Sequence, residues 1–182
     1  MLFCGIRESV AFLPNTSRDT LKILVAGVGN VLRGDDGFGV AVARTLRHCA
    51  FRDVNIFEAG IAGISLVQEL MDGYDALIVA DAIDRGGAPG TVYLIEPEIP
   101  RPPDPSNLHS SLADAHYTEP SEVLVLAKAL GVLPRKVFII GCQPHGYDEL
   151  GADLSPPVKA AVGVAVTRIR ALIESLQSGE TS

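Results

Sequence analysis

The sequence predicts an α/β fold with three α/β/α layers: a twisted, mostly parallel sheet of five strands with helices on both faces. Short apolar segments alternate with segments whose apolar residues recur at helical spacing, which is typical of parallel sheets covered by helices. The apolar runs are continuous, as expected for strands that are buried on both faces. One connection, at residues 85–90, is a turn containing Gly and Pro that has no room for a crossover helix. The strand after it is therefore expected to run antiparallel to its neighbour.

The remaining pattern gives the order of the elements. Strands are expected at residues 23–26, 54–57, 76–80, 91–95 and 137–140, and helices at 38–46, 64–71, 123–130 and 158–176. Residues 96–119 form the longest irregular stretch, and a loop of this length in a compact domain is usually functional or mobile. We expect one domain at residues 21–176, an N-terminal extension at 1–20 and a polar tail at 177–182.

Composition excludes several classes of function. The chain has 182 residues and a net charge of −7, which argues against nucleic acid as a partner. No run approaches the roughly 20 apolar residues that span a membrane, and charged residues interrupt any signal-peptide pattern in residues 1–20. The cysteines, Cys4, Cys49 and Cys142, are odd in number and far apart. We therefore expect a reducing, cytoplasmic setting, with Cys142 as a packed thiol.

Two adjacent acids, Asp35 and Asp36, lie in the loop between the first strand and the first helix. This position is at the carboxyl edge of the sheet, where open α/β folds hold ligands. Glycines in such a turn can serve its backbone angles alone, and one Asp can cap the helix. Two acids flanked by Gly34 and Gly37 exceed what capping needs. A dinucleotide fingerprint is incomplete because its third glycine is replaced by Leu32, and no P-loop pattern is present.

A third acid, Asp81, follows the most apolar strand. A carboxylate among apolar neighbours is costly unless it binds something, although it can also bond loop amides. The first and third strands of such sheets are commonly neighbours, so Asp81 and a loop acid are expected to face one crevice. With a histidine from residues 96–119, they suit a divalent metal such as zinc or nickel. The alternative is an acid pair that shares a proton for acid–base catalysis.

Five short motifs carry a family resemblance: residues 25–32 (VAGVGNVL), 34–40 (GDDGFGV), 80–83 (ADAI), 89–92 (PGTV) and 141–144 (GCQP). In combination they resemble the nickel-iron hydrogenase maturation proteases, over about residues 22–170. The resemblance implies an aspartyl-type endopeptidase that trims the C-terminal extension of a hydrogenase large-subunit precursor after nickel insertion. The nickel would arrive with the substrate and would not be a tightly held cofactor of the enzyme.

The resemblance also implies which residues act. Metal contact and catalysis fall to Asp36, Asp81 and His116; Asp36 has a shorter arm than the Glu found in many relatives. His116 stands seven residues before Val123, at the expected start of a helix. Its rival His109 lies in a Ser-containing stretch, but its distance to that helix is wrong by seven residues.

The rest of the loop motif is expected to contact the substrate, and this set comprises Gly34, Asp35, Gly37 and Gly39. Asp35 is also expected to bond within the loop or at a helix start. Two functions from other classes remain open: a non-catalytic escort of the metallated precursor, and a nucleotide-dependent oxidoreductase.

Overall fold

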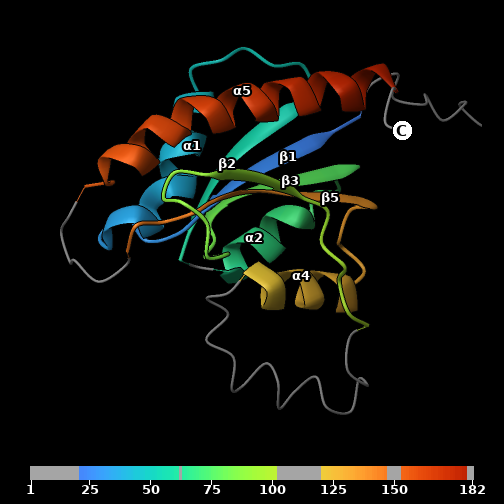
Figure 1. Cartoon of the computed structure of the whole chain (residues 1–182). Coiled ribbons are helices and arrows are strands. Elements are labelled where there is room, and N and C mark those ends of the chain that lie inside the picture. Colours follow the sequence, from blue (N-terminus) through green and yellow to red (C-terminus); the bar gives the residue numbers. More distant parts are fainter. Residues whose placement is uncertain (1–20, 62, 102–119, 147–152, 180–182) are drawn as a thin grey trace, which may run out of the picture.

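A five-stranded mixed sheet forms the centre of the computed structural model, which describes residues 21–61, 63–101, 120–146 and 153–179 (Figure 1). Its strands are β1 (Ile23–Val28), β2 (Val54–Gly60), β3 (Ala76–Ala82), β4 (Val92–Ile95) and β5 (Lys136–Cys142). They lie in the order β2-β1-β3-β5-β4, and only the β4–β5 pair is antiparallel. The predicted mixed sheet and the adjacency of the first and third strands are confirmed.

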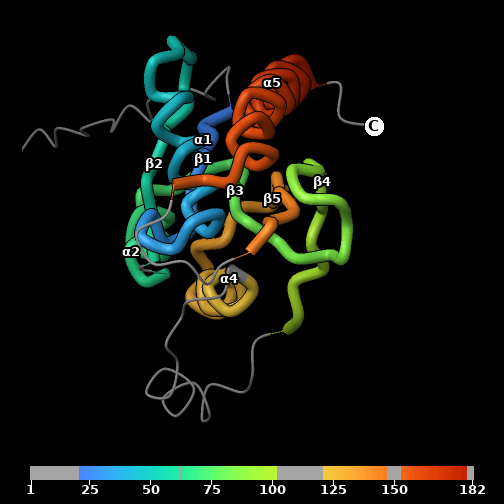
Figure 2. Tube along the Cα trace, turned by 60° about the vertical axis from the view of Figure 1, so that its left-hand side comes forward, coloured from blue at the N-terminus to red at the C-terminus, as the bar shows by residue number. Residues whose placement is uncertain are grey.

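Helices cover both faces of the sheet. The helices α1 (Phe38–Leu46) and α5 (Pro156–Ser178) cover one face, and α2 (Gly63–Leu70) and α4 (Pro120–Ala129) cover the other. A short 3₁₀ helix, η1 (Gly34–Gly37), directly precedes α1. Figures 1 and 2 show α5 above the strands and α4 below them. Among the described residues, no helix is both long enough and apolar enough to cross a membrane.

Alternate residues of the central strands feed two separate cores. In β1, Ile23 and Val25 belong to the core under α1 and α5, while Leu24 and Ala26 belong to the core over α2 and α4. β3 is buried along its whole length because it has a strand on each side and helices on both faces. This double burial explains why the strand segments are continuous apolar runs in the sequence.

Several elements are longer than the sequence pattern indicates. β3 continues through Ala82 because its pairing with β5 runs on to Cys142, so that Asp81 lies inside the strand and not after it. β1 likewise reaches Val28, and α5 ends at Ser178 rather than at residue 176. Backbone pairing is indifferent to the polarity of one side chain, and the apolar pattern therefore missed these ends. The extension at residues 1–20 and the stretch at 102–119 lie outside the described residues.

Glycines allow the start of α1 to press against the carboxyl ends of two strands. A Cβ on Gly39 would lie 2.0 Å from the carbonyl oxygen of Ala80 and 2.3 Å from that of Val28. A Cβ on Gly27 would meet the Gly39 carbonyl oxygen at 2.3 Å. Because no side chain fits in these gaps, the loop that carries the two acids is held directly against β1 and β3.

Substitution of Gly39 by Ala tests this contact. We expect Gly39→Ala to lower the free energy of unfolding by about 2 kcal/mol or more, since backbone must move to admit the methyl group. Gly163→Ala is the matched control because Gly163 is exposed within α5 and a Cβ there meets open space. That change should raise stability by about 0.5–1 kcal/mol. Chemical denaturation measures both values, and an unchanged stability in Gly39→Ala would contradict the packing.

Candidate functional site

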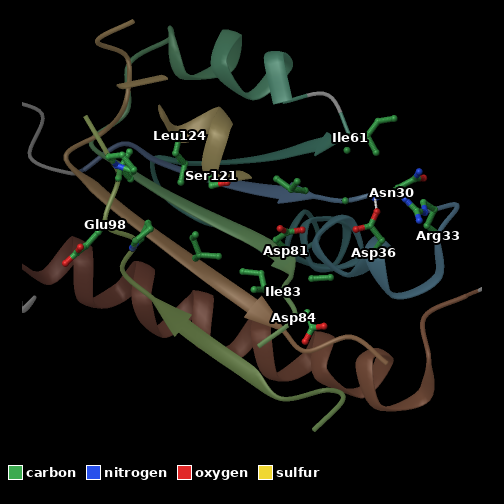
Figure 3. Close-up of a pocket in the computed structure, with 18 residues that line it drawn as sticks. Asn30, Arg33, Asp36, Ile61, Asp81, Ile83, Asp84, Glu98, Ser121 and Leu124 are labelled. Carbon is green, nitrogen blue, oxygen red and sulfur yellow. Dashed lines mark hydrogen bonds between the residues drawn. The ribbon is translucent and has the colours of Figure 1, made fainter. Parts of the chain in front are cut away.

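A cavity of about 860 Å³ opens at the carboxyl edge of the sheet (Figure 3). Its walls come from the ends of β1, β2 and β3, from the segment after β4 and from the start of α4. Most of the lining is apolar, and Arg33 is the one basic side chain among the described residues that line it. The acidic residues of the lining are Asp36, Asp81, Asp84 and Glu98.

Asp81 projects into this cavity from β3 with only 7% of its surface exposed. The pKa of its carboxyl is raised to about 7, chiefly by burial; a backbone hydrogen bond from Ala82 lowers this pKa, and the nearby charge of Asp36 raises it. A carboxyl that titrates near neutral pH can accept or give up a proton. A cation bound between the two acids would instead keep both ionised.

Asp36 reaches the same cavity from η1 (Figure 3). The backbone N–H of Asn30 donates a hydrogen bond to Asp36 Oδ2 at 3.0 Å, which fixes the side chain across the loop. The chain can turn this tightly because Gly29 has a φ of 124° and a Cβ there would lie 1.8 Å from the Asp36 carbonyl oxygen. The structure thus brings together Asp36 and Asp81, which are 45 positions apart in the sequence.

Asp35 has a different environment from its neighbour. Its carboxylate is 2% exposed and accepts three hydrogen bonds. Oδ1 accepts the backbone N–H of Ser155 at 2.7 Å, and Oδ2 accepts the backbone N–H of His145 at 2.7 Å and the Ser155 hydroxyl at 2.9 Å. Asp35 therefore bonds at a helix start, as expected, but the helix is α5 and not the adjacent α1.

The other residues expected to contact substrate are packed inside the loop. Gly34, Gly37 and Gly39 are buried, and none of them lines the cavity; neither does Asp35. Gly39 lies against the strand ends, and a Cβ on Gly37 would lie 3.2 Å from Val31 Cα. The glycines thus have a packing role that is independent of substrate, and their contact with substrate stays a prediction.

Sequence reasoning missed one buried polar group, Gln143, and the acid that it holds. Gln143 follows β5 directly, as a polar residue after an apolar run, which is the signal that singled out Asp81. Its Nε2 donates to Asp84 Oδ1 at 2.8 Å, and its Oε1 accepts the backbone N–H groups of Arg85 and Gly87 at 2.8 and 3.1 Å. These bonds fix the turn after β3 and place Asp84 in the wall of the cavity.

The proposed metal ligand set is incomplete within the described residues. His116 and its rival His109 both lie outside them. Residues 21–61, 63–101, 120–146 and 153–179 hold no group of three His, Cys, Asp or Glu side chains that would bind a metal ion. The packed thiol is confirmed: Cys142 is buried, and burial raises its pKa to about 11.

The comparison with known families identifies the chain. A family model described as HycI, hydrogenase maturation protease, matches residues 40–172. The chain belongs to the hydrogenase maturation protease family. The hydrogenase expression/formation protein HupD of Bradyrhizobium diazoefficiens is 38% identical over 157 residues, which cover 85% of this chain and 78% of HupD. The hydrogenase 2 maturation protease of Escherichia coli is 31% identical over 84% of this chain and 91% of its own length.

Solved structures of this family share the fold. The hydrogenase maturating endopeptidase HybD from Escherichia coli superposes with a TM-score of 0.67 at 29% identity, covering 85% of this chain and 93% of HybD. The [NiFe] hydrogenase maturation protease HycI from Thermococcus kodakarensis gives a TM-score of 0.64 at 26% identity, with 86% and 93% covered. The chain is therefore an endopeptidase, as the sequence predicts, and the escort and oxidoreductase alternatives are set aside.

The raised pKa of Asp81 predicts a pH-dependent stability. Asp81 binds its proton more tightly in the folded protein than in the unfolded chain, whose carboxyl titrates near 3.8. Its contribution to folding is therefore complete below about pH 4 and is lost as the pH rises through about 7. The rise of the Asp81 pKa from 3.8 to about 7 corresponds to a loss of at most roughly 4 kcal/mol in the free energy of unfolding over this pH range.

Denaturation of the metal-free protein between pH 4 and pH 8 measures this effect. Asp81→Asn should remove most of the decline in stability, so that the variant gains on the wild type as the pH rises. Asp72→Asn alters an exposed carboxyl outside the cavity and should leave the decline intact. An Asp81→Asn profile parallel to that of the wild type would contradict the assignment.

Proposed function

We propose that this endopeptidase removes the C-terminal extension of a nickel-iron hydrogenase large-subunit precursor after nickel insertion. It recognises the substrate's nickel through Asp36, Asp81 and His116. The observation that carries the proposal is the meeting of Asp36 and Asp81 in one cavity, where the charge of Asp36 opposes ionisation of the buried Asp81. The names of relatives support the substrate class, since HybD is a hydrogenase maturating endopeptidase.

A divalent cation is the natural partner for this pair. Two ionised carboxylates repel each other in a mostly apolar cavity, and a cation between them converts that repulsion into attraction. A neutral imidazole from His116 would complete an oxygen and nitrogen ligand set that suits nickel or zinc, with positions left open for the precursor. The metal would then let the enzyme distinguish a nickel-loaded precursor from a metal-free one, because the metal-free precursor lacks the ion that the carboxylates bind.

Hydrolysis at this site needs a water, a base and an electrophile. The substrate's nickel would polarise the scissile carbonyl or acidify a water. One carboxylate of the pair accepts a proton from the attacking water while the water oxygen bonds to the carbonyl carbon. The carboxyl group then gives this proton to the leaving amine as the C–N bond breaks. With a carboxylate as the base and water as the nucleophile, the enzyme would be an aspartyl-type protease that forms no covalent acyl-enzyme intermediate. We expect it to act in the cytoplasm, since the dispersed cysteines suit a reducing setting.

Neutral variants of the two acids test the proposal. Asp36→Asn and Asp81→Asn should each lower the rate of precursor shortening at least about 100-fold, since each loses a charged ligand and a candidate base. Mass spectrometry of a nickel-loaded precursor measures the loss of the extension, and circular dichroism checks the fold. Asp35→Asn is the matched control: it should cost stability at the α5 contact but less activity per folded molecule. Near-normal processing by Asp36→Asn or Asp81→Asn would refute the docking role.

The two histidines of the long stretch give a second test. His116→Ala should abolish shortening of the nickel-loaded precursor, because the imidazole ligand is lost. His109→Ala, seven residues earlier, should process the precursor within about twofold of the wild-type rate. The same mass assay measures both variants. The reverse pattern would transfer the ligand role to His109, and full activity in both would remove histidine from the site.

A further inference from the structure

Four exposed aliphatic side chains lie on the two segments that border the cavity after β1 and β2. Val31 and Leu32 lie on the loop after β1, with 46% and 63% of their surfaces exposed. Ile61 directly follows β2 at 61%, and Ile64 lies in the first turn of α2 at 51%. We call these four residues the aliphatic rim. Ile61 itself lines the cavity, so the rim is continuous with it.

The two parts of the rim are held side by side. The backbone N–H of Gly29 donates to the carbonyl oxygen of Gly60 at 3.0 Å, which joins the two loops at their bases. Within the first loop, Asn30 accepts the N–H of Leu32 on its side chain at 2.9 Å and the N–H of Arg33 on its carbonyl at 3.0 Å. Figure 3 shows Ile61, Asn30 and Arg33 at the same end of the cavity. The rim is therefore formed before any partner binds.

The rim residues are not needed by either core. The buried residues of α2 are Leu66, Val67 and Leu70, whereas Ile64 is half exposed and belongs to neither core. The other large hydrophobic side chains that are exposed in the described part of the chain are Met71 directly after α2, Leu94 in β4, Leu130 directly after α4 and Val164 in α5. A contiguous apolar surface beside a binding cavity marks an interaction site more often than a single exposed side chain does.

We propose that the aliphatic rim is the docking surface for the folded body of the precursor; this rests on the proposed function. The cavity has the size of a small-molecule site and accepts only the residues near the scissile bond. The rest of a protein substrate must then lie against its mouth. Exposed apolar residues beside one arginine, Arg33, suit the apolar core of a protein–protein interface, where arginine is also enriched. Because the rim is spread over two loops, it fits an apolar patch on a folded surface rather than one extended peptide.

The substrate concentration dependence of processing tests this inference. The double variant Leu32→Ser/Ile64→Ser changes two rim residues that do not line the cavity. With the full-length nickel-loaded precursor, it should raise KM about tenfold or more and leave kcat within about twofold, because docking weakens and the chemistry stays intact. Leu130→Ser/Val164→Ser removes exposed aliphatic side chains from other parts of the chain and should keep wild-type KM.

Three results would overturn the rim's assignment. The first is wild-type KM in the rim variant. The second is inhibition of the wild type, but not of the rim variant, by a synthetic peptide of the extension, which would make the extension the occupant. The third is a wild-type dimer that becomes a monomer in the rim variant by sedimentation equilibrium, which would make a second copy the occupant. A wild-type enzyme that does not shorten the precursor would instead refute the proposed function.

Discussion

The site depends on a contact that leaves no room for a side chain. Gly39 presses the start of α1 onto the carbonyl oxygens of Ala80 and Val28, and Gly29 turns the chain onto the backbone of Asp36. These contacts hold the loop acid beside the end of β3, where Asp81 is already buried. Desolvation by the two cores and repulsion by Asp36 then raise the pKa of Asp81 to about 7. Close packing at the glycines thus sets the position of Asp36 and, through it, contributes to the raised pKa of Asp81 in the cavity.

The two neighbouring acids divide the work of the loop. Asp35 is buried and accepts three hydrogen bonds, one from His145 after β5 and two from Ser155 just before α5, which tie the loop to the C-terminal part of the chain. Asp36 turns to the cavity and accepts one backbone hydrogen bond from Asn30. The hydrogen bonds of Asp35 hold the loop, and therefore Asp36, in position while they leave the Asp36 carboxylate available to a ligand. Gln143 anchors Asp84 on the other wall in a similar way.

Local patterns predicted the fold, Asp81 and a pair of adjacent loop acids, because alternating strands and helices place strand ends at one edge. The choice of Asp36 over Asp35 came from the family resemblance. Local patterns do not predict contacts between distant segments, such as the hydrogen bonds that Asp35 accepts from His145 and Ser155 and the one that Gln143 donates to Asp84. They also do not predict the aliphatic rim, since periodicity cannot distinguish a buried Ile from an exposed one at a helix start. His116 stays a prediction from resemblance.

The coupling of Asp36 to Asp81 is measured most directly by ¹³C NMR of the Asp81 side-chain carboxyl during a pH titration of the metal-free protein. We expect a midpoint near 7 in the wild type and a lower midpoint in Asp36→Asn, in which desolvation remains and the neighbouring charge is removed. A wild-type midpoint near the ordinary value of about 4, or the same midpoint in both proteins, would contradict this expectation.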